Sequence, residues 1–218
     1  MPLVAPDTYE ALASKLESLD PSNIYPGTPD AVLAGYKAQR KIYAREMRRT
    51  KISFASNLLR NQPRIQPVSS HIFSRGTIRI NSSDPEAEPI VDFRALSNPL
   101  DLDVWVAYLR FLRNFITTYF SEYSPTIVTP SPANFTSDEH LKNYIKKVYS
   151  PHGWHPLGTA AKMRREIGGV VDDELRVYGV NGLRVADASI FPTLISASTQ
   201  LTVYAIGEKA ADLIMKEW

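Results

Sequence analysis

The sequence predicts an α+β fold, a mostly antiparallel sheet with helices packed on one of its faces. Apolar residues recur at helical spacing between residues 102 and 120, whereas Thr77-Ile78-Arg79-Ile80 alternates polar and apolar side chains as a strand does. Helical and strand patterns then follow one another without the regular strand–helix–strand order of a parallel sheet. These observations favour antiparallel pairing over a doubly wound sheet.

Five segments carry helix signals. The first spans 7–19, with Asp7 as N-cap and Glu10 three residues later as a capping box. The second spans 29–48, with Asp30 in its first turn. Residues 102–120 and 137–149 follow, the latter capped by Ser137, and the last helix runs from Thr199 to about residue 216. The buried stripe expected on this last helix is Val203, Ile206, Ala210, Leu213 and Ile214.

Strands are expected between these helices. Residues 66–73 and 76–81 read as two strands joined by a turn at 74–76, and a second turn follows at 82–85. Residues 126–132 suggest a short strand and loop, and residues 52–60 are ambiguous. Short strands are expected near 154–160, 169–171, 176–180 and 183–187. We divide the chain into a helical segment, 1–65, that packs on a main domain, 66–218.

Composition excludes several classes of protein. The 218 residues contain 44% hydrophobic and 22% charged residues and carry a net charge of +2, as an ordinary globular domain does. No basic stripe indicates nucleic-acid binding, and no apolar run approaches the roughly 18 residues of a membrane span. Cysteine is absent, which excludes disulfides and thiolate metal sites. Without a signal-peptide pattern at the start, a cytoplasmic location is favoured.

A dinucleotide-binding turn is missing. Such a turn needs glycines so that its backbone can approach a pyrophosphate, with a helix N-terminus facing the charge. No Gly-x-Gly-x-x-Gly occurs in these residues, and Gly168-Gly169 leads into Val-Val-Asp rather than into a helix. A nucleotide cofactor therefore has no recognisable phosphate-binding turn in this sequence.

Two histidines, His152 and His155, flank Gly153-Trp154. A metal site would need a third ligand, and no partner cluster is visible, so we expect no metal. His152 reads as a capping or surface histidine after Pro151. For His155 the residues alone leave two interpretations open, a hydrogen-bonded, half-buried side chain and a general base.

Several motifs in order resemble the C-terminal, substrate-binding part of the glucose-methanol-choline (GMC) family of flavin-dependent alcohol oxidases and dehydrogenases. The resemblance extends from about Ser74 to Trp218 and is weaker over 7–73. The matching segments are Ser74–Ile80 with Asp84-Pro85 and Asp92, Trp154-His155-Pro156-x-Gly158-Thr159, Val171-Asp172, Val177-Tyr178-Gly179, Leu183–Ser189, and Gly207–Asp212 in the last helix. Members of this family carry their flavin mainly on an N-terminal half.

The resemblance implies roles for individual residues. His155 would be the base that removes the alcohol proton as hydride leaves for the flavin, and Trp154 beside it would contact substrate. The residues implied to face the flavin are Asp187, Ala188, Thr199, Gln200 and Leu201. The alternative interpretation of Asp187-Ala188-Ser189 is a turn at the end of a strand, with no role in flavin binding.

Two positions depart from the family pattern. A second histidine or asparagine beside the flavin is replaced by Ser198, six residues after Pro192, and Lys162 stands where the family often has methionine. We assign Ser198 to the catalytic site as a hydrogen-bond donor, although it is shorter than histidine and a poor base.

These observations leave three functions open. The chain is a GMC substrate domain that works with an N-terminal FAD-domain chain, or a repurposed flavin-independent cyclase, isomerase or dehydratase, or a non-catalytic ligand-binding protein. Each takes a small-molecule substrate or ligand. FAD is expected from the family, but we expect the chain alone not to retain it. A chain that awaits a flavin half should expose an apolar wall, whereas a repurposed domain should cover that wall or use it to form a homodimer.

Overall fold

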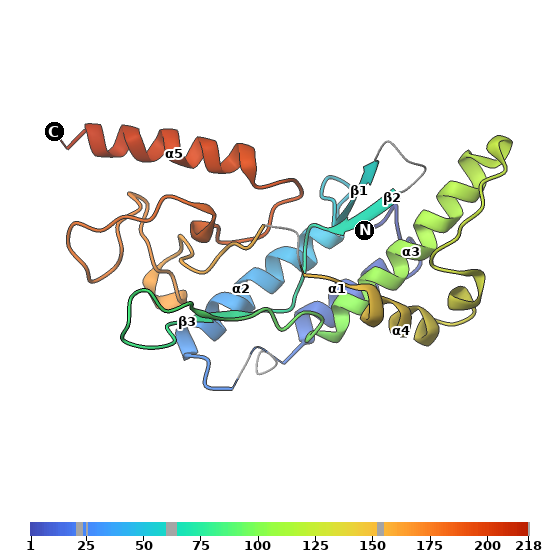
Figure 1. Ribbon diagram of the computed structural model, residues 1–218, viewed down its shortest axis with the longest axis horizontal. Coiled ribbons are helices and arrows are strands. Elements are labelled where there is room, and N and C mark those ends of the chain that lie inside the picture. Colours follow the sequence, from blue (N-terminus) through green and yellow to red (C-terminus); the bar gives the residue numbers. More distant parts are fainter. Residues whose placement is uncertain (21–23, 25, 60–64, 152–154, 218) are drawn as a thin grey trace.

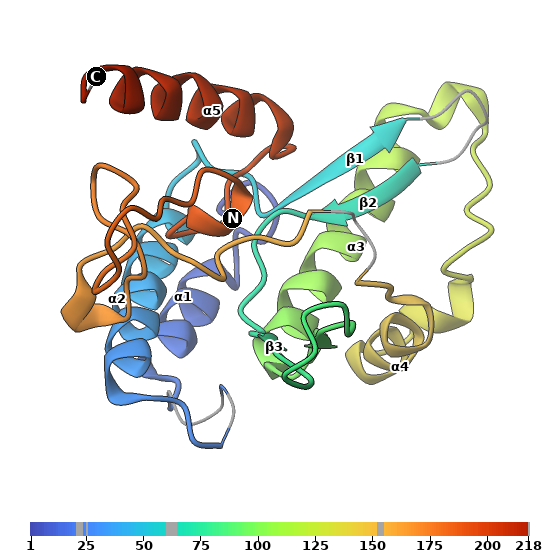
Figure 2. The ribbon, with the colours of Figure 1, turned by 60° about the vertical axis from the view of Figure 1, so that its left-hand side comes forward.

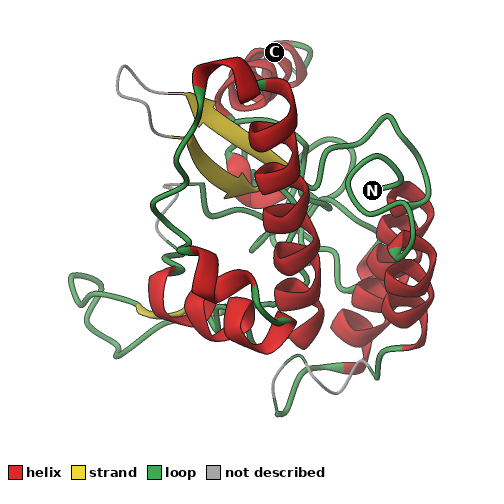
Figure 3. Ribbon diagram, turned by 90° about the vertical axis from the view of Figure 1, so that its right-hand side faces the viewer, coloured by secondary structure: helices red, strands yellow, loops and turns green. Residues whose placement is uncertain are grey.

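The computed structural model describes residues 1–20, 24, 26–59, 65–151 and 155–217. Helices dominate the architecture (Figures 1 and 3). They are α1 (Tyr9–Ser18), α2 (Asp30–Met47), α3 (Pro99–Tyr119), α4 (Asp138–Val148) and α5 (Gln200–Met215), with strands β1 (Ala55–Leu59), β2 (Ile65–Ser69), β3 (Thr77–Arg79) and β4 (Ile90–Asp92). Both strand pairs, β1–β2 and β3–β4, are antiparallel. The predicted α+β class with antiparallel pairing is confirmed.

The predicted hairpin between residues 66–73 and 76–81 is wrong. β2 ends at Ser69 and pairs back with β1, while β3 pairs forward with β4. The chain leaves β2 because Phe73 turns into the core, where it is 1% exposed. The end of β4 then packs closely against Gly76. Only glycine fits here, since a Cβ at this position would lie 2.3 Å from the carbonyl oxygen of Asp92.

The short strands expected after residue 154 are reduced to single bridges, which join Lys162 to Val171, Val171 to Val177 and Arg176 to Arg184. Four residues with positive φ turn the chain every few positions, so no ladder continues: Gly168, Leu175, Gly179 and Gly182. Residues 126–128 are also irregular rather than a strand. The alternating patterns here belong to loops that bury some apolar side chains, such as Val171 and Leu175, and expose others, such as Val180.

The start of helix α1 differs from prediction. Helix α1 begins after Thr8, no side chain caps it, and the capping box of Asp7 and Glu10 does not form. Glu10 instead accepts a hydrogen bond from Arg48 Nε at 2.8 Å. The cap of α4 is confirmed, because the Ser137 side chain accepts from the His140 amide.

Helix α3 starts earlier than predicted, because Asn98 caps it from outside the apolar repeat. The Asn98 side chain accepts a hydrogen bond from the Leu100 amide, and proline occupies the first helical position. The helix buries its first half and exposes its last turns, where Tyr119 is 72% exposed. The periodic pattern therefore predicted the helix but not which of its turns are covered.

Three apolar clusters form the core. The first joins α1, α2 and the start of α3, the second joins α3 to α4, and the third packs loops 171–191 against α5. Their most buried members include Leu16, Met47, Phe73, Leu100, Leu141 and Val171. Because residues 1–54 share the first cluster with residues 73–104, the N-terminal helices pack directly on the rest of the chain. The boundary at residue 65 stays a prediction.

A buried polar network joins α2 and α3 through residues 73–74. Asp101, in the first turn of α3, accepts hydrogen bonds from the amides of Phe73 and Ser74 at 2.7 and 3.0 Å and from the Ser74 hydroxyl at 2.5 Å. Tyr36 on α2 donates to the carbonyl of Phe73 at 2.9 Å, and Asn98 donates to Tyr36 at 3.3 Å. Burial raises the pKa of Asp101, and the hydrogen bonds from Ser74 and Phe73 oppose that rise.

Helix α5 lies along the outer edge of the molecule (Figures 1 and 2). Its predicted stripe is only partly covered, since Ala210 is buried while Val203, Ile206 and Leu213 are partly buried. Ile214 is 43% exposed, so its assignment to the stripe is wrong. Among the described residues, no helix is both long and apolar enough to cross a membrane.

We predict that Asp101→Asn lowers the free energy of unfolding by about 1–3 kcal/mol. The Ser74 amide and hydroxyl both donate to one carboxylate oxygen of Asp101, and the N–H₂ group of asparagine at that position could not accept from them. Urea unfolding followed by circular dichroism measures the change. Asp84→Asn is the matched control, since Asp84 lies in an exposed turn and asparagine caps such turns equally well. Equal midpoints for both variants would contradict the role given to Asp101.

Candidate active site

His155 meets the start of α5. Its Nδ1 lies 3.0 Å from the hydroxyl oxygen of Thr199, which is buried and immediately precedes the helix. The Thr199 side chain makes no capping hydrogen bond with its own helix, although threonine commonly does so. The hydroxyl is committed to the imidazole instead, which leaves the first turn of α5 without a side-chain cap.

The Thr199 contact decides which ring nitrogen is free for chemistry. Nδ1 is occupied, so only Nε2 can receive a proton from another molecule. Nε2 carries a lone pair when Nδ1–H donates to the Thr199 oxygen, and the imidazole can then act as a base. The reverse arrangement, with Thr199 donating, places the ring proton on Nε2 and leaves no free lone pair.

The segment after His155 pairs with the segment that contains Asp187. The amides of Gly158, Ala160 and Lys162 donate to the carbonyls of Ala188, Ser189 and Ile190 at 3.2, 2.9 and 2.7 Å. Gly158 has a φ of 82°, and a Cβ there would lie 3.2 Å from the Phe191 carbonyl oxygen. The glycine three residues after His155 is therefore needed for this close approach.

Helix α2 holds the chain that leads into α5. Gln39 donates to the Pro192 carbonyl at 2.5 Å and accepts from Arg75 at 2.8 Å, and the Tyr43 hydroxyl accepts from the Leu194 amide at 2.7 Å. Sequence reasoning missed both α2 residues, because nothing local to them indicates contact with a segment about 150 positions later. It also missed the hydrogen bond between Thr199 and His155.

The other predicted residues lie along the same stretch of chain. The Asp187 carboxylate caps the 3₁₀ helix η5 (Ala188–Ile190) by accepting from the Ser189 amide at 2.8 Å. Ala188 is partly buried, whereas Ser198 and Gln200 are exposed and Leu201 is 81% exposed. The flavin-facing roles given to these residues stay predictions. Trp154 and His152 lie outside the described residues.

His155 lies on an open face. Its side chain is exposed, and it borders neither of two hollows of about 190 and 260 Å³, which are lined by residues of α3 and of the N-terminal region. In the described part of the chain, histidine and carboxylate side chains do not gather in groups of three that could hold a metal ion. The lysine at position 162 pairs with Asp173 at 2.9 Å on the surface.

The histidine at the start of α5 lies within the Trp-His-Pro-x-Gly-Thr segment that carried the resemblance to a flavoenzyme substrate domain. The family model described as GMC oxidoreductase matches residues 73–207, and the chain belongs to this family. Its sequence is 36% identical over 211 residues to dehydrogenase xptC of Emericella nidulans, covering 96% of this chain and 34% of that protein. It is 37% identical over 159 residues to choline oxidase of Arthrobacter globiformis, covering 69% and 28%.

Solved structures agree. An FAD-dependent oxidoreductase from Chaetomium thermophilum superposes with a TM-score of 0.92 at 32% identity, over 98% of this chain and 37% of that one. A fungal aryl-alcohol oxidase gives 0.91 at 33% identity, over 100% and 37%. The chain thus spans about a third of the length of the relatives it matches, and it resembles their C-terminal, substrate-binding part.

We predict that His155 in the free chain holds its proton on Nδ1 at pH 8, because Thr199 accepts it. Nitrogen-15 NMR of the imidazole distinguishes the two tautomers. Thr199→Val removes the acceptor and should return the ring to the Nε2–H form, whereas Thr199→Ser should keep the Nδ1–H form. A ring that carries its proton on Nε2 before substitution would contradict this assignment.

Proposed function

We propose that this chain is the substrate-domain portion of an FAD-dependent alcohol oxidase or dehydrogenase, with His155 as the base that takes the proton of the substrate hydroxyl. The observation that carries the proposal is the hydrogen bond between His155 and Thr199 at the uncapped start of α5. It fixes an imidazole nitrogen beside a helix terminus, within a chain that belongs to the GMC family.

The chemistry suits these groups. FAD, which family members bind, supplies the acceptor for the hydride of the alcohol carbon. His155 takes the hydroxyl proton through Nε2, since imidazole accepts protons near neutral pH and so stabilises alkoxide character in the transition state. Thr199 holds the ring in one orientation, and when it accepts from Nδ1–H it also favours the tautomer that this step requires.

The residues at the start of α5 suit one wall of a flavin site. The first N–H groups of a helix lack partners within the helix, and the positive end of the helix dipole favours negative charge there. The N-cap residue Thr199 makes no side-chain cap at that end, and Gln200 and Leu201 are exposed. These features would suit the ring of FAD, but no glycine-rich turn for its pyrophosphate occurs in these 218 residues.

Two exposed apolar surfaces support a missing polypeptide partner. On α5, Leu201, Tyr204 and Met215 are 81%, 64% and 67% exposed. On the β3–β4 ribbon, Ile78, Ile80, Ile90 and Val91 are 52%, 88%, 53% and 50% exposed. Exposed apolar side chains of this kind are typical of an interface, and a two-stranded ribbon is marginally stable alone. We infer that a polypeptide carrying the FAD-binding half covers both surfaces.

A flavin-free cyclase or isomerase receives less support from the same geometry. Such an enzyme must hold a small substrate in a reactive conformation, which requires an enclosed cavity beside the catalytic group. His155 instead lies on an exposed face and lines neither hollow. The proposal therefore assigns the second wall of the site to the flavin-carrying partner.

We predict that the chain purified alone contains no FAD, because the cofactor's phosphates have no binding turn in this sequence. The visible absorbance band of flavin measures bound cofactor, after incubation with excess FAD and gel filtration. A yellow protein fraction with FAD bound in equal molar amount would contradict the need for a partner.

We also predict that His155→Ala abolishes alcohol oxidation in a complemented enzyme. The chain would be co-expressed with the N-terminal two thirds of dehydrogenase xptC, and flavin reduction by benzyl alcohol or choline would be followed without oxygen. Loss of a general base lowers the rate by about 10²–10⁴-fold. Bound flavin should be unchanged, since the substitution removes a proton acceptor and not the interface.

The matched control is His140→Ala, which removes an exposed imidazole on α4 that hydrogen-bonds Thr136. It should oxidise alcohol at the rate of the unsubstituted complex. A His155→Ala complex that binds flavin and keeps full activity would place the base elsewhere.

A further inference from the structure

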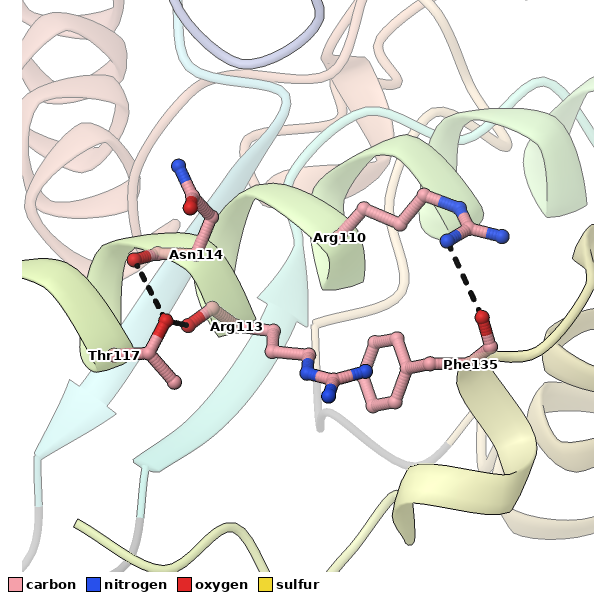
Figure 4. A pocket seen from close by; sticks show the side chains of 5 residues that line it. All are labelled: Arg110, Arg113, Asn114, Thr117 and Phe135. Atoms are coloured by element: carbon pink, nitrogen blue, oxygen red, sulfur yellow. Dashed lines mark hydrogen bonds between the residues drawn. The ribbon is translucent and has the colours of Figure 1, made fainter.

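A basic hollow of about 190 Å³ lies on the outer face of α3, away from the His155 site. Its lining residues are Arg110, Arg113, Asn114 and Thr117 of α3 and Phe135 of the 3₁₀ helix η3 (Pro132–Phe135) (Figure 4). The α3 residues follow one another at spacings of three, one and three, so they share one face of the helix. None of the five contributes to the His155 site.

Arg113 has no counter-charge within the described part of the chain. Its guanidinium lies 4.5 Å from the centre of the Phe135 ring, which is buried, so stacking fixes its position (Figure 4). Among the described residues, none accepts a hydrogen bond from it or forms an ion pair with it. A half-buried guanidinium that is rigid and keeps its N–H groups free is ready to bind an anion.

Arg110 is fixed beside the Phe135 backbone (Figure 4). It donates through Nε and Nη2 to one carboxylate oxygen of Asp138, at 3.0 and 2.6 Å, and through Nη1 to the Phe135 carbonyl at 3.4 Å. Asp138 is thus already engaged, and it leaves Arg113 as the uncompensated cation. Arg110 keeps further N–H groups, since a guanidinium has five.

Thr117 does not compete as a donor. Its hydroxyl hydrogen is directed to carbonyls of its own helix, with oxygen–oxygen distances of 3.0 Å to Arg113 and 3.2 Å to Asn114. The arginines and the side-chain amide of Asn114 are therefore the donors in this hollow with free N–H groups. A planar or tetrahedral oxyanion matches such donors, because it can accept two parallel N–H bonds from one guanidinium.

We propose that this hollow is a binding site for a small oxyanion, the phosphate or carboxylate group of a ligand, with Arg113 as its principal donor and Arg110 as the second. The volume is several times the roughly 30 Å³ that a water molecule occupies in the liquid, so such a group enters without displacing protein atoms. Both arginines are held by other contacts before the ligand arrives, which lowers the entropic cost of binding. The site is independent of the proposed redox function.

Titration of the nitrogen-15-labelled chain with inorganic phosphate tests the site. The Nε–H signal of Arg113 and the amides of Asn114 and Thr117 should shift saturably, while sodium chloride at equal ionic strength should leave them in place. Succinate in a parallel titration distinguishes the source, since tighter phosphate or tighter dicarboxylate binding identifies the group that the hollow selects.

Arg113→Gln should weaken binding at least tenfold, and Arg164→Gln, which removes an exposed charge far along the sequence, should not. Arg113→Lys retains the charge but loses the paired N–H donors of the guanidinium, so its affinity for phosphate should lie between those of the other two variants. Three outcomes would overturn the proposal: equal shifts with chloride, unchanged affinity in Arg113→Gln, or shifts spread over the whole surface.

Discussion

The rest of the molecule depends on the hydrogen bonds that the Asp101 carboxylate accepts. It is buried and binds the backbone of Phe73 and Ser74, and so fixes an irregular segment against the start of α3. A buried carboxylate is costly unless it accepts several hydrogen bonds, and here it accepts three. Because Tyr36 binds the carbonyl of the same Phe73, the network also fixes α2. Two helices and the chain between them are positioned together.

The position of the candidate active site follows from this arrangement. Arg75 comes directly after the fixed segment and binds Gln39, which in turn binds the carbonyl of Pro192. Tyr43, one turn further along α2, binds the amide of Leu194. Five residues after Leu194 the chain reaches Thr199, whose hydroxyl contacts His155. Helix α2 lies outside the residues matched by the family model, 73–207, yet it holds the segment that carries the site.

Local signals in the sequence were sufficient for the helices. Ser137 predicted the start of α4 correctly, because an N-cap needs only its own next three residues. The strands failed for the opposite reason. Whether residues 76–81 pair with 66–73 or with 90–92 depends on Phe73 entering the core and on the close approach at Gly76, and neither is visible in an alternating pattern. The motif around His155 was recognised, but its partner Thr199 depends on a fold that brings residues 44 positions apart into contact.

The exposure of His155 is expected if this chain forms one side of the active site and the proposed flavin-carrying partner forms the other. A base on an open face is surrounded by water, which weakens its interaction with a developing charge and competes for the proton. The same face begins α5, where Leu201 and Tyr204 are exposed although they are apolar or aromatic. A partner that covers these side chains would release water from apolar surface, and that gain in free energy would drive association. The same association would exclude water from His155, so the energy that assembles the enzyme would also activate its base.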